Sequence, residues 1–289
     1  MQYLFHVLIV AEIYCILSLS LSLIVGYTGL PALGHAAFFA VGAYASSLFC
    51  LNLGLSPWLG MLLGAILALL LGVVVALPSL RLLGDYFALA TFGLGLVVYY
   101  IVRNWASFTR GPMGLPNIPK LTFFGLRLGN VYGYFLVSLG FLLVTVTVVH
   151  RIVNSPFGRV LKSIREDETG SQALGKNTSR NKLIVCMTGA LFAGVAGSLY
   201  AHYVTFIAPE SFTFLESITI LLMVILGGMG SITGSILGGI ILVLFPELLR
   251  FVGMPSSVAA PMRQILYGLL LVLLMIWRPQ GLLGTYRFK

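Results

Sequence analysis

The sequence predicts an all-α protein, a polytopic transmembrane helical bundle of about eight to ten spans with glycine-rich broken helices and one polar segment outside the membrane. Hydrophobic residues make up 59% of the 289 residues and charged residues only 9%, whereas soluble domains carry about 25% charged residues. Mean hydropathy is +1.03, and apolar runs long enough to cross a bilayer recur along the chain. A membrane β-barrel would show short segments of alternating polarity, which are absent from this sequence.

Nine apolar segments are predicted to cross the membrane. The first follows an N-terminus without the basic residues of a signal peptide, so we expect it to be retained. Glycine-rich stretches at 26–34 and 227–239 interrupt the helical pattern and predict broken helices. No loop is long enough for a soluble domain, so residues 1–289 form a single transmembrane domain. The predicted spans are 4–25, 31–50, 58–77, 86–102, 131–150, 183–204, 217–230, 235–250 and 264–277.

The basic residues predict the orientation of the chain. Loop 151–182 carries seven Lys or Arg and loop 103–130 carries four. The two loops flank the single span 131–150 and must therefore lie on opposite faces. Because basic residues favour the cytoplasmic side, we expect loop 151–182 to be cytoplasmic and loop 103–130 extracytoplasmic. The cytoplasmic side is also predicted for Arg81, Arg278, Arg287 and Lys289.

The formal net charge of +9 does not predict a nucleic-acid partner. The bases sit in connecting loops rather than on a helix face with interleaved aromatic residues, so we attribute them to topology and contact with lipid headgroups. Cys15, Cys50 and Cys186 lie in apolar surroundings without CxxC or Cys/His spacing. They predict buried free thiols and no metal site.

Few ionisable residues are predicted at membrane depth, namely Glu12, His35 and His202. A charged group near the bilayer centre costs about 2.5–3.5 kcal/mol or more. A neutral His35 facing a neighbouring helix is the simplest interpretation, and Glu12 is either protonated or near the outer interface. The absence of a chain of intramembrane carboxylates argues against an ion-coupled pump.

Small residues recur at every fourth position in two segments: Ala32, Ala36 and Ala40, and Gly230, Gly234 and Gly238. Such a stripe lets two helix backbones approach closely in lipid, and simple helix packing explains either one alone. The glycines and Pro31 also predict helices broken near the midplane, where unwound backbone is tolerated only beside protein or a water-lined cavity. Because one such segment lies in each half of the chain, the pair favours a permeation path.

The longest polar stretch, 158–182, contains GSQALGKN, which nearly matches the phosphate-binding pattern G-x-x-x-x-G-K-[ST]. Asn177 stands where that pattern has a hydroxyl residue, and the preceding letters SIREDET do not form a buried strand. We interpret the match as accidental. Ser155-Pro156 instead predicts a helix start, followed by a second short helix near 169–174 that ends at Gly175. An apolar face on the first helix predicts docking onto protein or the membrane surface.

Seven stretches together resemble the permease subunits of branched-chain amino acid ABC importers, specifically the longer-looped of the two paired membrane subunits. The resemblance covers nearly the whole chain. The stretches are GYTGLPALGHAAFFAVGAYAS at 26–46, LRLLGDYFALATFGLG at 80–95, NWASFTRGPMGLPNIP at 104–119, SPFGRVLKSIREDETGSQALGKN at 155–177, AGVAGSLYAH at 193–202, GGMGSITGSILGG at 227–239 and RPQGLLG at 278–284.

This resemblance implies the function and the partners. The chain is expected to be an ABC-importer permease domain in a bacterial inner membrane, paired with a second homologous permease. Two cytoplasmic ATP-binding subunits and an extracytoplasmic solute-binding protein complete the importer. ATP is then bound by partner subunits, and this chain carries no catalytic residue, metal or cofactor of its own. Its solutes are expected to be branched-chain amino acids.

The resemblance also implies a set of site residues, and the glycine-rich breaks suggest a second set. The segment 155–177 is expected to meet the ATPase, with Thr169, Gly170 and Ser171 at the positions where many importers have Glu-Ala-Ala before a glycine. The ATPase-coupling residues are then Phe157, Val160, Leu161, Ile164, Arg165, Glu166, Asp167, Glu168, Ala173 and Gly175. The broken-helix setting suggests a translocation path lined by Gly26, Thr28, Gly29, His35, Gly42, Gly227, Gly228 and Gly230.

Three alternatives stay open at this point. The first is an importer of the same class for urea, short amides or other amino acids, because selectivity rests largely on the binding protein. The second is an ion-coupled secondary transporter, which would work without an ATPase. The third is an intramembrane enzyme, against which the sequence shows no HExxH, no GxSxG and no paired intramembrane carboxylates.

Overall fold

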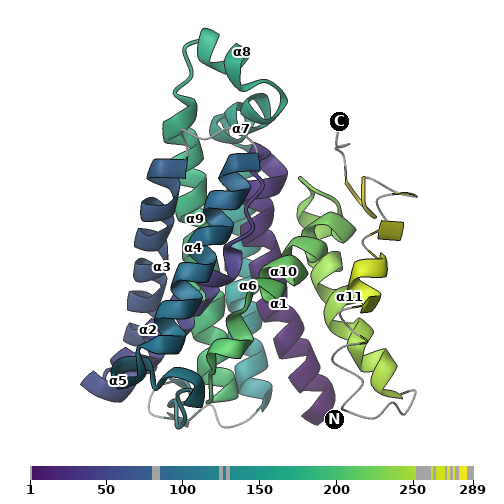
Figure 1. Cartoon of the computed structure of the whole chain (residues 1–289). Helices are drawn as coiled ribbons and strands as arrows, with labels where there is room; N and C mark the ends of the chain where they lie inside the picture. Colours follow the sequence, from purple (N-terminus) through teal and green to yellow (C-terminus); the bar gives the residue numbers. More distant parts are fainter. Residues whose placement is uncertain are drawn as a thin grey trace.

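The computed structural model describes residues 2–79, 85–123, 126–127, 131–251, 262, 265–270, 272–273, 276 and 280–284. Within them the chain is a bundle of helices (Figure 1). Seven described helical stretches are long and apolar enough to cross a membrane, and the stretch Ile232–Glu247 is apolar but shorter. The prediction of a polytopic helical bundle is confirmed. The long helices are α1 (Gln2–Thr28), α2 (His35–Leu53), α3 (Pro57–Ser79), α4 (Asp85–Asn104), α6 (Val131–Asn154), α9 (Thr178–Val204), α10 (Phe214–Gly227) and α11 (Ile232–Phe251).

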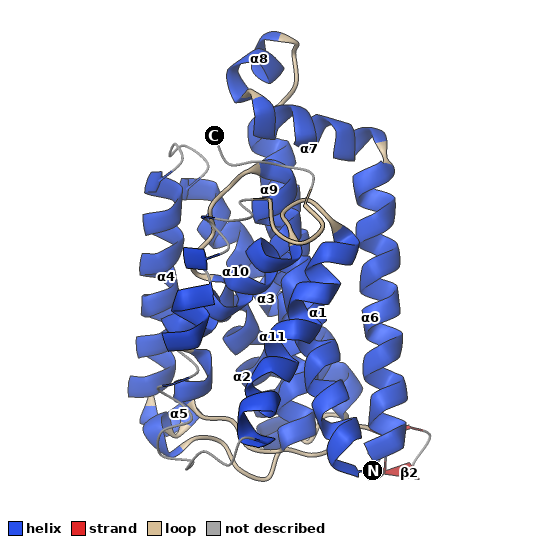
Figure 2. Cartoon of the chain, turned by 90° about the vertical axis from the view of Figure 1, so that its right-hand side faces the viewer, coloured by secondary structure: helices blue, strands red, loops and turns tan. Residues whose placement is uncertain are grey.

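Short elements cap the two ends of the bundle. Helices α7 (Pro156–Glu166) and α8 (Glu168–Ala173) lie at one end, and α5 and strand β2 lie at the other (Figure 2). The two most basic loops are therefore at opposite ends, as predicted. At the second end are α5 (Ala106–Thr109), the 3₁₀ turns η1 (Gly111–Met113) and η2 (Pro209–Phe212), and the antiparallel pair β1 (Thr122–Phe123) and β2 (Leu126–Arg127).

The core of the bundle is formed by α1, α2, α3 and α9. These helices pack closely because glycines of one helix lie against the backbone of the next. A Cβ atom at Gly42 of α2 would lie 2.2 Å from the Gly194 carbonyl oxygen of α9, and one at Gly197 would lie 2.1 Å from the Phe39 oxygen. Helices α4 and α6, and the outer side of α3, expose apolar side chains such as Leu62 of α3, and lipid accepts such a surface.

The first predicted chain break follows α1 rather than interrupting it. α1 is continuous for 27 residues, about 40 Å of helix, which is enough for a full crossing. The chain is nevertheless interrupted within the predicted segment 26–34, between α1 and α2. Gly29 has φ +70°, residues 29–34 are not helical, and α2 begins at His35, four residues later than the predicted span 31–50. Ala32 lies in this turn, so Ala32, Ala36 and Ala40 do not form one helical stripe.

The chain turns back into the bundle after α1. The His35 Nε2 atom lies 2.7 Å from the hydroxyl of Ser20, which is buried in α1 well before its end. Helix α2 therefore starts at a depth inside the bundle, below the end of α1. Gly34 is required in this turn because a Cβ atom there would lie 2.0 Å from the Thr91 carbonyl oxygen of α4.

The second predicted break separates α10 from α11. Gly228 and Gly230 have φ of +108° and +75°, and neither residue is helical. The predicted span 217–230 therefore lies three residues later in the chain than α10 at both ends. In contrast, the stripe prediction is confirmed for Gly234 and Gly238 of α11. A Cβ atom at either position would lie within 2.3 Å of a carbonyl oxygen of α10, that of Gly227 or Met223.

The C-terminal part of the chain is described only in pieces. Residues 265–270 are helical and lie within the predicted span 264–277. Several other residues of that span are outside the described residues. The backbone N–H groups of Leu282 and Leu283 donate to the carbonyl oxygens of Leu226 and Gly227, so residues 280–284 contact the end of α10. Arg81, Arg278, Arg287 and Lys289 also lie outside the described residues.

Candidate functional site

Helix α7 is anchored to the bundle by its apolar face. It starts at Ser155, whose hydroxyl accepts a hydrogen bond from the Gly158 N–H at 3.3 Å, with proline at the first helical position. Leu161 and Ile164 are buried, and the helix packs against α1, α6 and α9. Phe157 and Val160 are partly buried. The apolar stripe therefore docks onto the chain's own bundle, which leaves the opposite face of α7 open.

Arg165 of α7 lies between the two chain breaks. Its side chain is only 12% exposed, and its Nη1 atom donates to the carbonyl oxygen of Gly26 at 2.7 Å. This oxygen belongs to the last turn of α1, where carbonyls lack helical partners and a positive charge is favourable. Nη2 lies 3.1 Å from a Glu166 oxygen. A Cβ atom at Gly29 or Gly230 would come within 3.0 Å of the arginine side chain, so both glycines leave it room.

The two breaks also contact each other. A Cβ atom at Gly26 would lie 2.6 Å from the Gly230 nitrogen, so α1 and the α10–α11 turn meet backbone to backbone. Thr28 hydrogen-bonds within α1, to the Ile24 oxygen. The structure thus gathers Gly26, Thr28, Gly29, Gly227, Gly228 and Gly230 at the end of the bundle beside α7.

The other two predicted path residues lie elsewhere. Gly42 packs against Gly194 in the core. His35 is fully buried and contacts Ser20, while its Nδ1 atom has no hydrogen-bond partner among the described residues. Neither residue touches Arg165 or the α10–α11 turn in the contacts described above. The predicted set therefore divides into one cluster beside α7 and two separate positions inside the bundle.

Acidic residues of the polar segment hold α8 in place. The Asp167 side chain accepts from the Gly170 N–H at 2.9 Å as the N-cap of α8. A Cβ atom at Gly170 would lie 2.7 Å from an Asp167 carboxylate oxygen. Glu168 pairs with Lys182 of α9, whose side chain is 5% exposed. These contacts fix the α8 turn against α9.

The tip of α8 is open to the surroundings. Ala173 and Gly175 are exposed, and Gly175 has φ +74°, the left-handed conformation predicted for the end of this helix. Sequence reasoning missed Leu174 between them, which is 77% exposed. In the stretch GSQALGKN, residues 170–173 belong to α8 and residues 174–177 form the connection to α9. Helix α7 precedes α8. This setting differs from the strand–loop–helix of a phosphate-binding loop.

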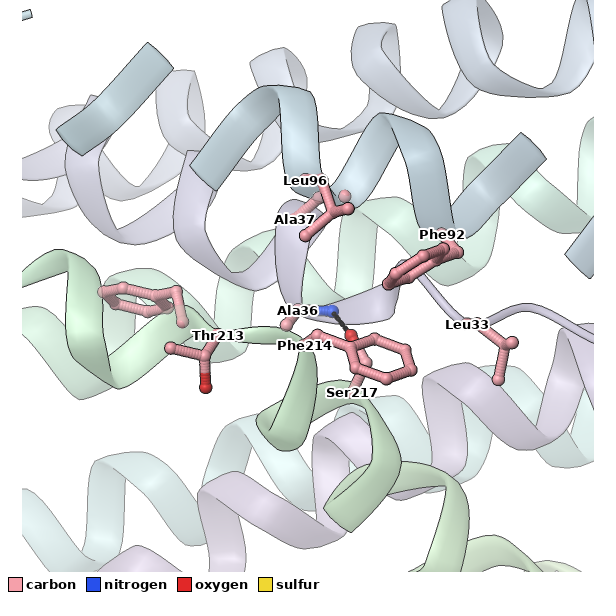
Figure 3. A pocket seen from close by; sticks show the side chains of 10 residues that line it. Leu33, Ala36, Ala37, Phe92, Leu96, Thr213, Phe214 and Ser217 are labelled. Carbon is pink, nitrogen blue, oxygen red and sulfur yellow. Dashed lines mark hydrogen bonds between the residues drawn. The ribbon is translucent and has the colours of Figure 1, made fainter. Parts of the chain in front are cut away.

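Helices α2 and α10 begin side by side. The Ala36 N–H in the first turn of α2 donates to the Ser217 hydroxyl of α10 at 2.9 Å (Figure 3). Gly34 gives no side-chain cap, so Ser217 caps α2 from a neighbouring helix. The cavity beside this contact has a volume of about 10 Å³, about the least space that holds one water molecule. The junction is closed in this conformation.

Loss of the Ser217 cap is expected to destabilise α2. Ser217→Ala leaves the Ala36 N–H without its partner in a buried site, so we expect about 1–2 kcal/mol lower stability in denaturant unfolding. Thr219→Ala on the same helix is the matched control, because its hydroxyl bonds only within α10. Equal losses in the two variants would contradict the capping role.

Sequence reasoning also missed three carboxylates near α10 and α11. Glu210, Glu216 and Glu247 line a cavity of about 390 Å³. The predicted span started at 217 and so left Glu216 outside the membrane, whereas α10 begins at Phe214. Of the residues that were predicted at depth, Glu12 is buried and accepts a hydrogen bond from Ser138. His202 is buried with Nδ1 2.7 Å from the Pro119 oxygen.

Known proteins resemble this chain over nearly its full length. The model of a family described as branched-chain amino acid transport system / permease component matches residues 3–275. The high-affinity branched-chain amino acid transport system permease protein LivM of Escherichia coli (strain K12) is 38% identical, over 95% of this chain and 68% of that protein. The probable LivM permease protein of Methanocaldococcus jannaschii is 28% identical, over 94% of this chain and 90% of the relative.

The second kind of relative is more distant. The high-affinity branched-chain amino acid transport system permease protein LivH of Salmonella typhimurium is 23% identical, over 98% of this chain and 95% of that protein. No solved structure matches the chain. The match to the family model and the identity to LivM together show that this multi-pass membrane protein belongs to the family of permease components of branched-chain amino acid transport systems.

Proposed function

We propose that the chain is a permease subunit of an ATP-binding cassette importer and forms part of the path for branched-chain amino acids across a bacterial inner membrane. Family membership and the multi-pass helical bundle support this function. The observation that carries the mechanism is the Arg165 contact, which ties the segment outside the bundle to the ends of α1 and α10.

We expect this chain to contact four kinds of partner: a second permease, the ATPases, a solute-binding protein and lipid. A second permease is supported by the relatives, because both LivM and LivH proteins resemble the chain. Two cytoplasmic ATPases would dock on α7 and α8, and a solute-binding protein would deliver solute to the opposite end, near α5. Lipid surrounds the remaining faces. ATP is bound by the ATPases, so this chain needs no cofactor.

The ATPases would move this chain through α8 and the open face of α7. The exposed tip residues Ala173, Leu174 and Gly175, together with Glu166, offer the docking surface. Because Leu161 and Ile164 are buried in the bundle, α7 cannot swing freely and must pass displacement inwards. Arg165 passes that displacement to Gly26 and to the turn that contains Gly230. The paired breaks can then shift relative to each other, which opens or closes the path beside them.

The proposal is tested by reconstitution. The complete complex in liposomes, with the solute-binding protein outside and ATP inside, is expected to accumulate radiolabelled leucine. A complex with catalytically inactive ATPases is the control and is expected to accumulate none. Leucine uptake by this chain alone under an ion gradient would contradict the proposal. Accumulation of urea or a short amide, without leucine, would keep the importer and overturn the solute.

A further inference from the structure

We infer that Lys182 and Glu168 are positioning residues, which fix α8 on α9 and give the ATPase a second connection to the bundle, separate from Arg165. This inference rests on the proposed function, which supplies an ATPase that docks on α7 and α8. Lys182 is a buried charged residue near the start of α9, with a side chain only 5% exposed. Its Nζ atom lies 2.5 Å from a carboxylate oxygen of Glu168, the first residue of α8.

Helix α8 is attached to the bundle by polar contacts. All six of its residues are described, and the buried one among them, Ser171, is polar. The Ser171 hydroxyl lies 2.6 Å from the hydroxyl of Ser163 in α7. The side-chain amide of Gln172 donates to the Thr178 hydroxyl of α9 at 3.0 Å. The orientation of α8 on the bundle therefore depends on these hydrogen bonds and on the ion pair with α9.

The ion pair is the strongest of these contacts, because a charge-assisted hydrogen bond is roughly twice as strong as a neutral one. A buried charge is tolerated when an opposite charge and hydrogen bonds replace its hydration. The Glu168 side chain is 30% exposed, so water still solvates part of it. The two partners thus differ in their needs: Lys182 requires the carboxylate for its burial, whereas Glu168 remains solvated without the ammonium group.

The ion pair connects α8 to the core of the bundle. Helix α9 packs against the backbone of α2, since a Cβ atom at Gly197 would lie 2.1 Å from the Phe39 carbonyl oxygen. The Ser198 hydroxyl of α9 also donates to the Gly42 carbonyl oxygen of α2 at 3.0 Å. A displacement of α8 that reaches α9 through Lys182 is therefore passed to α2, the helix that follows the first chain break.

Arg165 and Lys182 therefore act on the two helices that flank the first chain break. Arg165 donates to the Gly26 carbonyl oxygen in the last turn of α1, and Lys182 acts on α2 through α9. Helix α9 also packs against α1, where a Cβ atom at Gly189 would lie 2.7 Å from the end of the Ile24 side chain. The closest approach is to α2, so a push on α7 and α8 can shift α1 and α2 relative to each other.

Lys182→Met separates a positioning role from a structural one. Methionine keeps much of the length of the buried side chain, and replacing a buried ion pair by apolar groups of similar volume is often neutral for stability. The carboxylate that remains is partly exposed and stays solvated. In the reconstituted complete complex, we expect the ratio of leucine transported to ATP hydrolysed to fall at least fivefold, with assembly and unfolding temperature unchanged.

The matched control and the rescue use the same complex. Arg180→Met removes one positive charge from an exposed position in the first turn of α9 and is expected to keep the ratio. Glu168→Lys and Lys182→Glu are each expected to lower the ratio, because they place like charges together. The double exchange restores opposite charges and is expected to recover part of the loss. Recovery is incomplete because a lysine at the start of α8 opposes the helix dipole.

The position of α8 is measured directly by pulsed electron paramagnetic resonance. Spin labels are placed at Leu174 and at Leu143 on the exposed face of α6, in a chain whose three buried cysteines are replaced by alanine. We expect the distribution of distances between the labels to broaden in Lys182→Met and to stay narrow in Arg180→Met.

Three results would overturn the inference. The first is an unchanged transport ratio, or an unchanged distance distribution, in Lys182→Met while the unmodified complex transports leucine; this result leaves the importer intact. The second is a fall in the ratio matched by a fall in unfolding temperature, without recovery in the double exchange, which would assign the pair a structural role alone. The third is failure of the unmodified complex to transport leucine, which would overturn the proposed function and this inference together.

Discussion

Arg165→Glu is expected to abolish solute uptake by the complete importer while ATP hydrolysis continues. The substitution removes the hydrogen bond to the Gly26 carbonyl oxygen and places a negative charge against the negative end of the α1 dipole. It also adds repulsion from Glu166, which now pairs with the arginine. The ratio of leucine molecules transported to ATP hydrolysed is the measurement, and we expect it to fall at least tenfold.

A graded series shows whether the contact itself carries the coupling. Arg165→Lys keeps a positive charge but has a single donor group in place of the planar fork, so we expect an intermediate ratio. Arg151 lies exposed in the last turn of α6, and Arg151→Glu controls for the change in net charge. If Arg165→Glu and Arg151→Glu lowered the ratio equally, the role of the inserted arginine would be refuted.

Gly42→Val is expected to prevent the bundle from folding normally. The added Cβ atom would lie 2.2 Å from the Gly194 oxygen and 2.4 Å from its Cα atom, and these backbone atoms of α9 cannot rotate away as a side chain can. We expect a loss of at least about 3 kcal/mol in stability, because overpacking here must separate two core helices. Thermal unfolding followed by size-exclusion chromatography measures the effect.

The matched control for that substitution is Gly140→Val in α6. Nothing lies within 4 Å of a Cβ atom at Gly140, so only the small difference in helix propensity applies there. We expect its unfolding temperature to stay close to that of the unmodified chain. Similar losses at both positions would show that valine in any transmembrane helix is disruptive and that the Gly42–Gly194 contact has no special weight.

The hydrophobic pattern was sufficient to predict the seven described helices that are long and apolar enough to cross a membrane, because lipid allows only segments that satisfy their own backbone hydrogen bonds. The helix start at Ser155-Pro156 and the cap at Gly175 were also predicted correctly, since both depend on local chemistry. The exact chain breaks were not. Whether α2 begins at residue 31 or 35 depends on contacts with Ser20, Thr91 and Ser217 from other helices.

The candidate site shows the same limit. The apolar stripe of α7 was recognised, but the sequence alone could not say whether Leu161 faces a partner or the chain's own bundle. Nothing in the sequence around Arg165 predicts its hydrogen bond to the Gly26 carbonyl oxygen, because the two residues lie far apart in the chain. Glu216 was missed because averaging hydropathy along the sequence ends an apolar span at a charged residue, so the predicted span began only after it. A carboxylate in the first turn of an apolar run, three residues after the Ser-Phe-Thr sequence at 211–213, is the signal that could have identified it.

The central claim is that a separate ATPase drives this chain through the tip formed by α7 and α8. Leu174, an exposed large apolar side chain of that tip, is the position to test by photo-crosslinking in the assembled, transport-active complex. We predict that a photoreactive residue at 174 captures the ATPase subunit, with yield that changes when ATP is bound, while one at the outward-facing Leu143 of α6 captures none. Capture of the ATPase from position 143 and not from 174, in a complex that still transports, would contradict the account.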